Sequence, residues 1–516
     1  MTRELSLRRS EERERNRAVR IAAAALLVAT LATAGWVQAG EAASARGTAV
    51  IAIVQAGPLG ASTPAGFVGL SFEYSAVPAY AGAPSAINPA LVQLIRNLAP
   101  GRTPVLRIGG DSTDTTWWPV RGVRQPGIVN YTLTRGWLQT TAALARATGA
   151  RLILGINLAT NDPRLAAAEA RALLAGIGRR SIEALEVGNE PDVYQSFPAY
   201  RNAHGAIVHV RGPRYDFGTY LKQFSAVRRA LPRLPIAGPA LGGAGWISKL
   251  GQFITAEPSL RLVTLHFYPL VCFAPPSSPL YPTIAHLLSD ASTTDLARSL
   301  AGPAEVAHAN GLELRVGELN SVTCGGRLGV SNTFASALWA LDTLFALDQA
   351  GVDGVNFHTF PGAIYAPFSF TDAGGQRSAS VLPEYYAMLM FGRAAPPGSR
   401  ILPVKTVPAG PVKVWATVAH NKTVRVVLIN ERASSEQVLL TAPPGATGPA
   451  ASEQLLAPSL TATSGVSLGG QSFGSSTDTG ILTGPPEDGS IARVKGVYPV
   501  TLPPDSATLL SWRPGV

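Results

Sequence analysis

The chain has 516 residues, of which 46% are hydrophobic and 15% charged, so it can bury a large core and is not a disordered protein. Its formal net charge of +10 is not gathered into a basic stripe interleaved with aromatic residues, which excludes nucleic acid as the expected partner. An acidic polymer is compatible with this charge.

The first 45 residues have the features of an export signal. A charged leader precedes the apolar stretch IAAAALLVATLATAGW, and an A-x-A-like tail follows at Ala43 to Ala45. Because the apolar stretch is short for a bilayer span, a signal peptide is the first interpretation and an uncleaved membrane anchor the second. In both cases we expect an exported protein, secreted or anchored outside the cytoplasm, with membrane contact only through such an anchor.

From residue 64 to 395 the chain repeats one pattern, in which a β-rich apolar run ends in polar residues and is followed by a loop and an amphipathic helical stretch. Eight such runs occur, at residues 66–74, 104–114, 151–160, 182–191, 234–240, 260–269, 312–321 and 353–360. This alternation predicts a (β/α)8 barrel, with a doubly wound parallel sheet as the alternative. Polar residues end nearly all eight runs, which favours the barrel, because barrel active sites are built at these strand ends.

Residues 396–516 have a different sequence pattern. Short strand-like runs such as KVWATVAH, TVRVVLINE and SATLLSWRP are separated by Gly, Pro, Ser and Thr and lack helical periodicity. They predict a C-terminal β-sandwich after the α/β barrel. The segment 46–63 contains the run TAVIAIVQ (48–55), which precedes the barrel and is a candidate strand of this sandwich.

Two glutamates end predicted strands: Glu190 in VGNEPD ends the fourth, and Glu318 in VGELNS ends the seventh. Three strands apart around a ring of eight, their side chains can face each other across the barrel mouth. Retaining glycoside hydrolysis needs two carboxyl groups about 5–5.5 Å apart, one to protonate the departing oxygen and one to attack the anomeric carbon. Asn189, beside Glu190, can hydrogen-bond the sugar hydroxyl next to the reacting carbon.

These motifs resemble those of the large clan of retaining glycosidases with (β/α)8 barrels. Within the clan the chain resembles glycoside hydrolase family 79, the family of β-glucuronidases and heparanase. The resemblance covers the barrel, and family members also carry a C-terminal β-domain. It is carried by RIGGDSTD, VGNEPD, LHFYP and GELNSVTCGG...SNTFASALWALD, with a weaker piece in GAIYAPFSF...LPEYYAMLMF after strand eight.

The resemblance implies a retaining enzyme that cleaves β-D-glucuronides, with 4-O-methyl-glucuronides as an open variant, from glycans by double displacement. In this reading Glu318 is the nucleophile and Glu190 the acid/base, whose protonated form the neighbouring anion promotes. The substrate is a glucuronic-acid-containing glycan, and no cofactor is needed.

The remaining family roles concern the sugar and its carboxylate. His266 and Tyr268 match clan positions near the nucleophile, where a tyrosine hydroxyl can hydrogen-bond the carboxylate, and Glu73 and Asp111 match positions that contact sugar hydroxyls. The uronate would be held by the backbone N–H groups of a glycine pair after strand seven and by a tyrosine after strand eight. Here these residues are Gly325, Gly326 and Tyr365.

Only two cysteines occur. The register of the resemblance puts Cys272 in the loop after strand six and Cys324 in the loop after strand seven, where heparanase has an aromatic residue and a loop one residue shorter. Adjacent loops on one face can bring the two sulfurs together, so we predict a Cys272–Cys324 disulfide.

Two other functions remain open at this point. A neutral-sugar β-glycosidase of the same clan would keep both glutamates without needing an anion pocket, and a non-catalytic carbohydrate-binding barrel would need neither glutamate. His204 and His209 have the spacing of a metal pair but lack a matching ligand set, so no metal is predicted.

Overall fold

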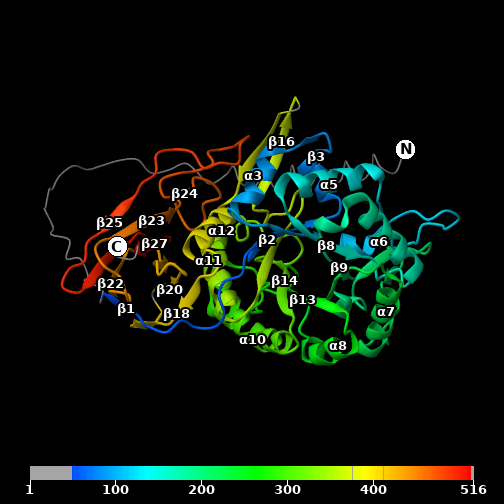
Figure 1. The fold of residues 1–516 in the computed structure, drawn as a ribbon, viewed down its shortest axis with the longest axis horizontal. Helices are drawn as coiled ribbons and strands as arrows, with labels where there is room; N and C mark the ends of the chain where they lie inside the picture. Colours follow the sequence, from blue (N-terminus) through cyan, green and yellow to red (C-terminus); the bar gives the residue numbers. More distant parts are fainter. Residues whose placement is uncertain (1–48, 375, 411, 513–516) are drawn as a thin grey trace, which may run out of the picture. The chain divides into compact units, whose positions relative to one another are not determined.

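The computed structural model describes residues 49–374, 376–410 and 412–512, so the predicted signal lies outside the described residues. Eight parallel strands form a closed barrel (Figure 1), and each of the eight predicted runs overlaps one of them, which confirms the barrel prediction. In order around the ring the strands are β2 (Val68–Glu73), β5 (Val105–Gly109), β8 (Arg151–Ile156), β9 (Ile182–Val187), β12 (Ile236–Leu241), β13 (Leu260–Phe267), β14 (Glu313–Leu319) and β15 (Gly354–Thr359).

Four of the helices between these strands begin at side-chain caps. The Asn88 side chain accepts hydrogen bonds at the start of α3, and Thr134, Asp162 and Asp216 do the same for α5, α6 and α7. No described helix combines the length and the apolar composition that a membrane span requires. The helices are α3 (Pro89–Asn97), α5 (Arg135–Thr148), α6 (Pro163–Ile177), α7 (Phe217–Ala230), α8 (Leu250–Ala256), α10 (Thr294–Ala309), α11 (Phe334–Gln349) and α12 (Pro383–Ala394).

Shorter elements fill the connections. Two hairpins that the sequence did not predict are β10 (Pro198–Arg201) with β11 (Ile207–His209) and β16 (Phe368–Ala373) with β17 (Gln376–Val381). The first pair is mostly exposed on both faces, so no alternation of apolar and polar residues marks it. The other short elements are α2 (Ala76–Ala81), β3 (Gly82–Ala83), β4 (Ala86–Ile87), α4 (Ser112–Thr115), β6 (Thr116–Trp117), β7 (Tyr131–Thr132), η1 (Arg179–Ser181), η2 (Pro191–Val193), η3 (Ile247–Lys249), α9 (Ile284–Leu287) and η4 (Asp290–Ser292).

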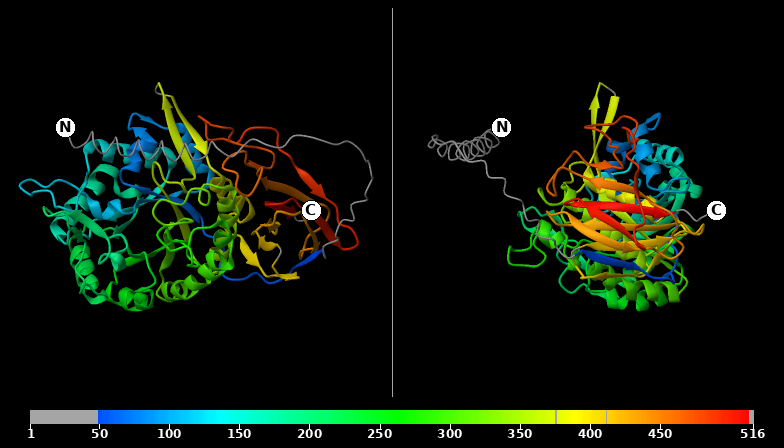
Figure 2. Two further views of the ribbon diagram at one scale, coloured as in Figure 1. Left: turned by 180° about the vertical axis from the view of Figure 1, so that it is seen from behind. Right: turned by 90° about the vertical axis from the view of Figure 1, so that its left-hand side faces the viewer.

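A sandwich of two sheets follows the barrel, as predicted (Figure 2). One sheet has the strand order β19-β1-β22-β26, with β1 (Val50–Val54) antiparallel to β19 (Val404–Val407) and parallel to β22 (Glu436–Thr441). The first described strand therefore lies among strands from the end of the chain. The remaining strands are β18 (Arg400–Leu402), β20 (Lys413–Val418), β21 (Val424–Asn430), β23 (Ala450–Leu456), β24 (Ser467–Leu468), β25 (Gly489–Ile491), β26 (Val497–Leu502) and β27 (Ser506–Trp512).

Strand β21 is apolar on both faces because both are covered. Its residues Val426 and Leu428 belong to the core between the two sheets, whereas Val427 and Ile429 belong to the large core that continues into the barrel. On the barrel side, the Trp415 indole N–H donates to Asp342 of α11 at 2.7 Å. The sandwich and the barrel are thus packed on a shared apolar core.

The position of β1 generates a stability prediction. Ala52 is fully buried in the sandwich core, whereas the adjacent Ile51 is 40% exposed. Replacing Ala52 by Asp buries an unpaired charge, so we expect Ala52→Asp to lower the melting temperature by on the order of 5–10 °C. Ile51→Asp is the matched control and should shift it far less. Thermal unfolding followed by circular dichroism measures both, and equal shifts would contradict the assignment of these faces.

Candidate active site

A pocket of about 740 Å³ opens at the carboxyl ends of the barrel strands. A larger cavity of about 1100 Å³ lies at the opposite, amino-terminal end, where barrel enzymes do not carry their chemistry. The first pocket contains both predicted glutamates and most of the other predicted site residues. Its lining includes Glu73, Asp111, Glu190, Tyr268, Glu318, Gly325, His358 and Tyr365.

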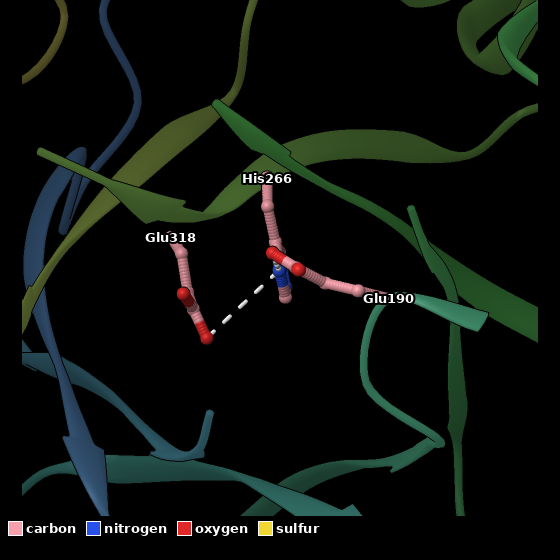
Figure 3. A group of neighbouring side chains, drawn as sticks. All are labelled: Glu190, His266 and Glu318. Carbon is pink, nitrogen blue, oxygen red and sulfur yellow. Dashed lines mark hydrogen bonds and ion pairs between the residues drawn. The ribbon is translucent and has the colours of Figure 1, made fainter. Parts of the chain in front are cut away.

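Glu190 lies in the turn after β9, where its backbone has the left-handed φ of 49°. Its N–H donates to the carbonyl oxygen of Ala240 at 2.8 Å, which ties the turn to β12. Gly242 comes so close that a Cβ there would lie 2.3 Å from the carboxyl carbon of Glu190. His266 Nδ1 is 3.0 Å from Glu190 Oε1 (Figure 3). The carboxyl group is therefore fixed from several sides, while 23% of the side chain stays exposed to the pocket.

Glu318 ends β14 and is almost fully buried. The Tyr268 hydroxyl donates to its Oε2 at 2.8 Å, and Arg107 Nη1 donates to its Oε1 at 2.6 Å. His266 Nδ1 and His358 Nδ1 lie 3.8 and 3.9 Å from the same Oε1. Burial by itself would raise the pKa of this carboxyl group. The two histidines, the guanidinium and the tyrosine hydroxyl together outweigh burial, so the pKa of Glu318 lies well below its usual range.

Arg107, on β5, was missed by the sequence analysis although it lies in the quoted motif RIGGDSTD. Its side chain is fully buried, and its three nitrogens donate to Glu186 Oε2 at 2.5 Å, to Glu318 Oε1 and to Asn189 Oδ1 at 2.9 Å. A positive charge inside an apolar strand was the available signal, because a buried arginine needs a partner of opposite charge.

Asp114 is a second missed residue from the same motif. It is buried, and one carboxyl oxygen accepts the N–H groups of Leu158 and Ala159 at 2.9 and 3.0 Å. The other oxygen accepts the Asn189 N–H at 3.0 Å and the Tyr194 hydroxyl at 2.5 Å. Asp114 therefore joins the loop after β8 to the turn that carries Glu190.

The other predicted sugar-binding residues lie beside the glutamates. Both oxygens of Glu73 accept backbone N–H groups, from Asp111 at 3.1 Å and from Ser112 at 2.8 Å. His358 Nε2 lies 3.3 Å from Glu73 Oε1. Burial alone would lower the pKa of His358, but Glu318 and Glu73 raise it above its ordinary value. His358 also went unnoticed in the sequence, although it ends the eighth predicted run.

The two glycines of the predicted anion pocket, Gly325 and Gly326, differ in their position relative to the pocket. Gly325 lines the pocket with a φ of 85°, and its carbonyl oxygen accepts the Ile364 N–H at 2.6 Å. Gly326 is not among the lining residues, and its N–H donates to the carbonyl oxygen of Thr323 at 3.2 Å. Tyr365 is buried and lines the pocket, with its ring centroid 6.2 Å from that of Tyr268. Of the three residues, Gly325 and Tyr365 are thus available to a bound sugar.

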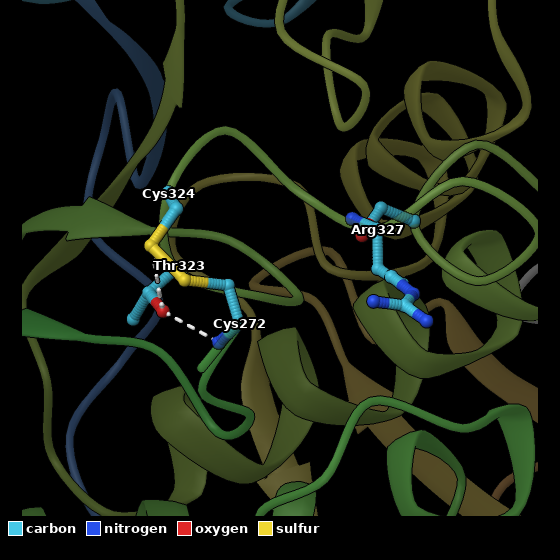
Figure 4. Close-up of a disulfide and its surroundings, with 5 residues drawn as sticks. Cys272, Thr323, Cys324 and Arg327 are labelled. Carbon is cyan, nitrogen blue, oxygen red and sulfur yellow. Dashed lines mark hydrogen bonds between the residues drawn. A yellow bond between two sulfur atoms is a disulfide. The ribbon is translucent and has the colours of Figure 1, made fainter. Parts of the chain in front are cut away.

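Cys272 and Cys324 form a disulfide in the structure, with their Cα atoms 6.1 Å apart (Figure 4). The Thr323 hydroxyl accepts the N–H of Cys272 at 3.0 Å, so a hydrogen bond runs beside the bridge. Thr323 and Cys324 both line the pocket. The disulfide therefore joins the loops after β13 and β14 at the pocket rim.

Glu190, His266 and Glu318 each place one polar atom within 4.8 Å of the other two, a spacing that a metal ion could also use. However, the Glu318 oxygen that faces His266 already accepts a hydrogen bond from the Arg107 cation. A second cation at this oxygen would be repelled. One oxygen of Glu190 and one of Glu318 therefore lie within 4.8 Å of each other, which is compatible with the separation of about 5–5.5 Å between the carboxyl groups of retaining glycosidases.

Comparison with known proteins agrees with this fold. No protein-family model matches the chain. A β-glucuronidase from Neurospora crassa is 24% identical over 413 residues, which cover 70% of this chain and 71% of that protein. A 4-O-α-L-rhamnosyl-β-D-glucuronidase from Fusarium oxysporum 12S has a TM-score of 0.69 and 21% identity, over 89% of this chain and 100% of that one. A GH51 arabinofuranosidase from Xanthomonas axonopodis pv. citri has a TM-score of 0.60 and 14% identity, over 90% and 99%. The protein is a glycoside hydrolase built on a (β/α)8 barrel.

Proposed function

We propose that the protein is a retaining β-glucuronidase of the family 79 type, with Glu318 as nucleophile and Glu190 as acid/base. The observation that carries the mechanism is the close approach of these two carboxyl groups at the ends of β9 and β14. The similarity to two glucuronidases supports glucuronides as the substrate class.

In the first step Glu318 attacks the anomeric carbon while Glu190 gives its proton to the leaving oxygen. The lowered pKa of Glu318 keeps the nucleophile ionised, and the Tyr268 and Arg107 hydrogen bonds fix the direction of its two oxygens. The products are a covalent glycosyl-enzyme ester on Glu318 and the free leaving group.

In the second step Glu190 takes a proton from water, and that water attacks the anomeric carbon and releases Glu318. His266 Nδ1, hydrogen-bonded to Glu190 Oε1, positions this carboxyl group in both steps. Two displacements at one carbon restore the original configuration, so the product is the β-anomer.

Recognition of the sugar follows from the lining of the pocket. Glu73 and Asp111 line the pocket and are suited to hydrogen-bond the ring hydroxyls, and the Asn189 amide lies behind them, where it donates to Asp111 at 3.4 Å. The uronate carboxylate is held by the Gly325 N–H and the Tyr365 hydroxyl, which are neutral donors.

A neutral-sugar β-glycosidase is the second candidate, and one observation favours it. No lysine or arginine is among the described residues that line the pocket, whereas four carboxyl groups are. A neutral sugar avoids repulsion from these carboxylates, so the two candidates differ in substrate charge.

The deciding experiment is hydrolysis of p-nitrophenyl β-D-glucuronide beside the matching β-glucoside and β-xyloside. We expect kcat/KM for the glucuronide to exceed kcat/KM for the glucoside and the xyloside by about 100-fold. A neutral sugar has no carboxylate to accept hydrogen bonds from the Gly325 N–H and the Tyr365 hydroxyl, so these donors would be left unpaired. The Glu318→Ala variant, purified in the same way, controls for host enzymes. Activity on a neutral glycoside alone would select the second candidate.

The two glutamates should differ in their dependence on the leaving group. Glu318→Ala should be inactive on every substrate, whereas Glu190→Ala should lose about 10²–10⁴-fold on poor leaving groups and far less on activated aryl ones. Azide should restore turnover of the aryl substrate by Glu190→Ala, since a small anion needs no general base, and should yield the β-glucuronosyl azide. Equal losses on both kinds of substrate would contradict the acid role.

A matched control for these variants is Glu183→Ala. Glu183 is also on β9, but it lies at the amino end of the strand, is 45% exposed and pairs with Arg151 on the surface. Exposed ion pairs contribute little, so this variant should keep full activity.

We further propose that the enzyme is exported and that the Cys272–Cys324 bridge forms outside the cytoplasm. Cys324 is exposed, so a reduced thiol there would be reactive. Alkylation of the native protein without reductant should leave its intact mass unchanged, and alkylation after reduction should add two groups. Two groups added without reductant would contradict the bridge.

A further inference from the structure

The cavity of about 1100 Å³ at the amino end of the barrel differs in chemistry from the catalytic pocket. It is lined by residues at the beginnings of the strands, such as Val105 of β5 and Leu262 of β13. The lining also includes the carboxylates of Glu183, Glu313 and Asp353. Its positive charges outnumber these, since six arginines line the same cavity: Arg102, Arg146, Arg151, Arg180, Arg261 and Arg315.

Arg315, on β14, is the buried member of this group, with only 6% of its surface exposed. Its Nε donates to Asn356 Oδ1, and its Nη2 donates to the Gly66 carbonyl oxygen at 2.9 Å. Among the described residues, no carboxylate forms an ion pair with it. Burial lowers the pKa of Arg315 to about 10, against the smaller opposite effect of nearby carboxylates, so the side chain is still charged at neutral pH.

The other buried arginine of the described chain, Arg107, has the pairing that Arg315 lacks. Arg107 contacts two carboxylates, Glu186 at 2.5 Å and Glu318 at 2.6 Å. A charge that is buried without a partner of opposite sign is costly. An anion bound in the cavity would supply this partner to Arg315.

Three further arginines of the cavity have free guanidinium groups. Within the described part of the chain, the side chains of Arg102, Arg146 and Arg180 make no hydrogen bond or ion pair, and all three are exposed. They come from the loop before β5, the last turn of α5 and the short helix η1 before β9. The fold therefore brings free cationic groups from separate segments to one cavity.

Two of the three carboxylates in the lining already have partners. Glu183 Oε2 lies 2.9 Å from Arg151 Nε. Asp353 Oδ2 accepts the Leu314 N–H at 2.8 Å and lies 2.8 Å from His308 Nε2. These contacts leave the free arginines of the cavity without a neutralising partner.

The cavity suits an acidic glycan better than other anions. Guanidinium groups bind carboxylates through two parallel hydrogen bonds. Small-molecule sites typically measure about 300–1,000 Å³, so this cavity is larger than a single inorganic anion needs. No aromatic side chain is among the described residues that line it, so nucleic acid bases would find nothing to stack on. A chain of uronate sugars carries a carboxylate on each ring and can bind through ion pairs alone.

The two ends of the barrel also differ in the sign of their charge. The described lining of the catalytic pocket has four carboxyl groups and no lysine or arginine, whereas arginines predominate in the cavity at the amino end. An acidic polymer is repelled by the first lining and attracted by the second. A segment bound at the amino end leaves the catalytic pocket free, because the two open at opposite ends of the barrel.

We propose that the arginine-lined cavity is a non-catalytic binding site for a uronate-containing segment of an acidic glycan, with one carboxylate of the segment paired to Arg315. The choice of a glycan as the occupant rests on the proposed function, in which the substrate is a glucuronic-acid-containing glycan. Such a site holds the enzyme on the polymer without taking part in the reaction.

The test is binding of hexagalacturonate to the protein, measured by isothermal titration calorimetry. This oligosaccharide carries a carboxylate on every ring but has no β-glucuronide bond, so the proposed activity does not consume it. One variant combines Arg102→Ala, Arg146→Ala and Arg180→Ala. It should raise the Kd about 10-fold, because three ion pairs to the ligand are lost. Since all three residues are exposed and far from the glutamates, it should hydrolyse p-nitrophenyl β-D-glucuronide at the wild-type rate.

The matched control combines Lys405→Ala, Lys422→Ala and Arg493→Ala. It removes the same charge from exposed positions of the C-terminal sandwich and should keep the wild-type Kd. An equal loss of affinity in the two triple variants would reveal a general charge effect and overturn the inference. Equally tight binding of uncharged cellohexaose, of inorganic phosphate or of a thymidine hexanucleotide would overturn the choice of an acidic glycan.

Hydrolysis separates this inference from the proposed function. Hexagalacturonate should not inhibit turnover of the aryl glucuronide, and competitive inhibition that persists in the arginine variant would place it in the catalytic pocket instead. A wild-type protein that hydrolyses the glucuronide but does not bind hexagalacturonate would overturn the inference alone. A protein that binds hexagalacturonate through these arginines but is inactive on glucuronides would contradict the proposed function and leave the binding site in place.

Discussion

The active site depends on one buried cation. Arg107 lies inside the barrel between Glu186 and Glu318, and a charge buried in this way is stable only when it is paired on every side. Burial alone would lower the pKa of this guanidinium, but the two carboxylates raise it, so it stays charged. Because Arg107 also donates to Asn189, it links Glu318 on β14 to the turn that carries Glu190. One guanidinium thus helps to position both glutamates, Glu318 directly and Glu190 through Asn189.

The two glutamates have different surroundings, and this difference suits the different roles proposed for them. Glu318 is buried and contacts cations and a phenol, which stabilise its anion. Glu190 has no arginine beside it, remains partly exposed and meets only a histidine ring. In the proposed mechanism the buried Glu318, paired with cations, is the nucleophile, and the partly exposed Glu190 is the acid/base. The Glu190 N–H donates to the Ala240 carbonyl oxygen, Asp114 accepts the N–H of the preceding Asn189, and Gly242 packs against the Glu190 carboxyl group.

Much of the fold and part of the site could be read from the sequence. All eight barrel strands were predicted because buried parallel strands are short apolar runs, and both glutamates stood out because a polar residue ends such a run. Arg107, Asp114 and His358 could not be assigned in the same way, since their importance lies in partners on other strands. The hairpin β10–β11 was missed because its residues are mostly exposed and follow no period.

The location of β1 has a consequence for how the chain folds. All the barrel strands come between β1 and its neighbours β19 and β22 in the sequence. The first described strand therefore cannot pair until most of the chain has been synthesised. Contacts between such distant segments form slowly, because a long loop must close first. During synthesis the barrel strands emerge before β19 and β22. The apolar residues of β1 therefore stay unpaired until these two strands have been made. For a chain that crosses a membrane amino end first, this strand needs protection from aggregation until the sandwich closes over it.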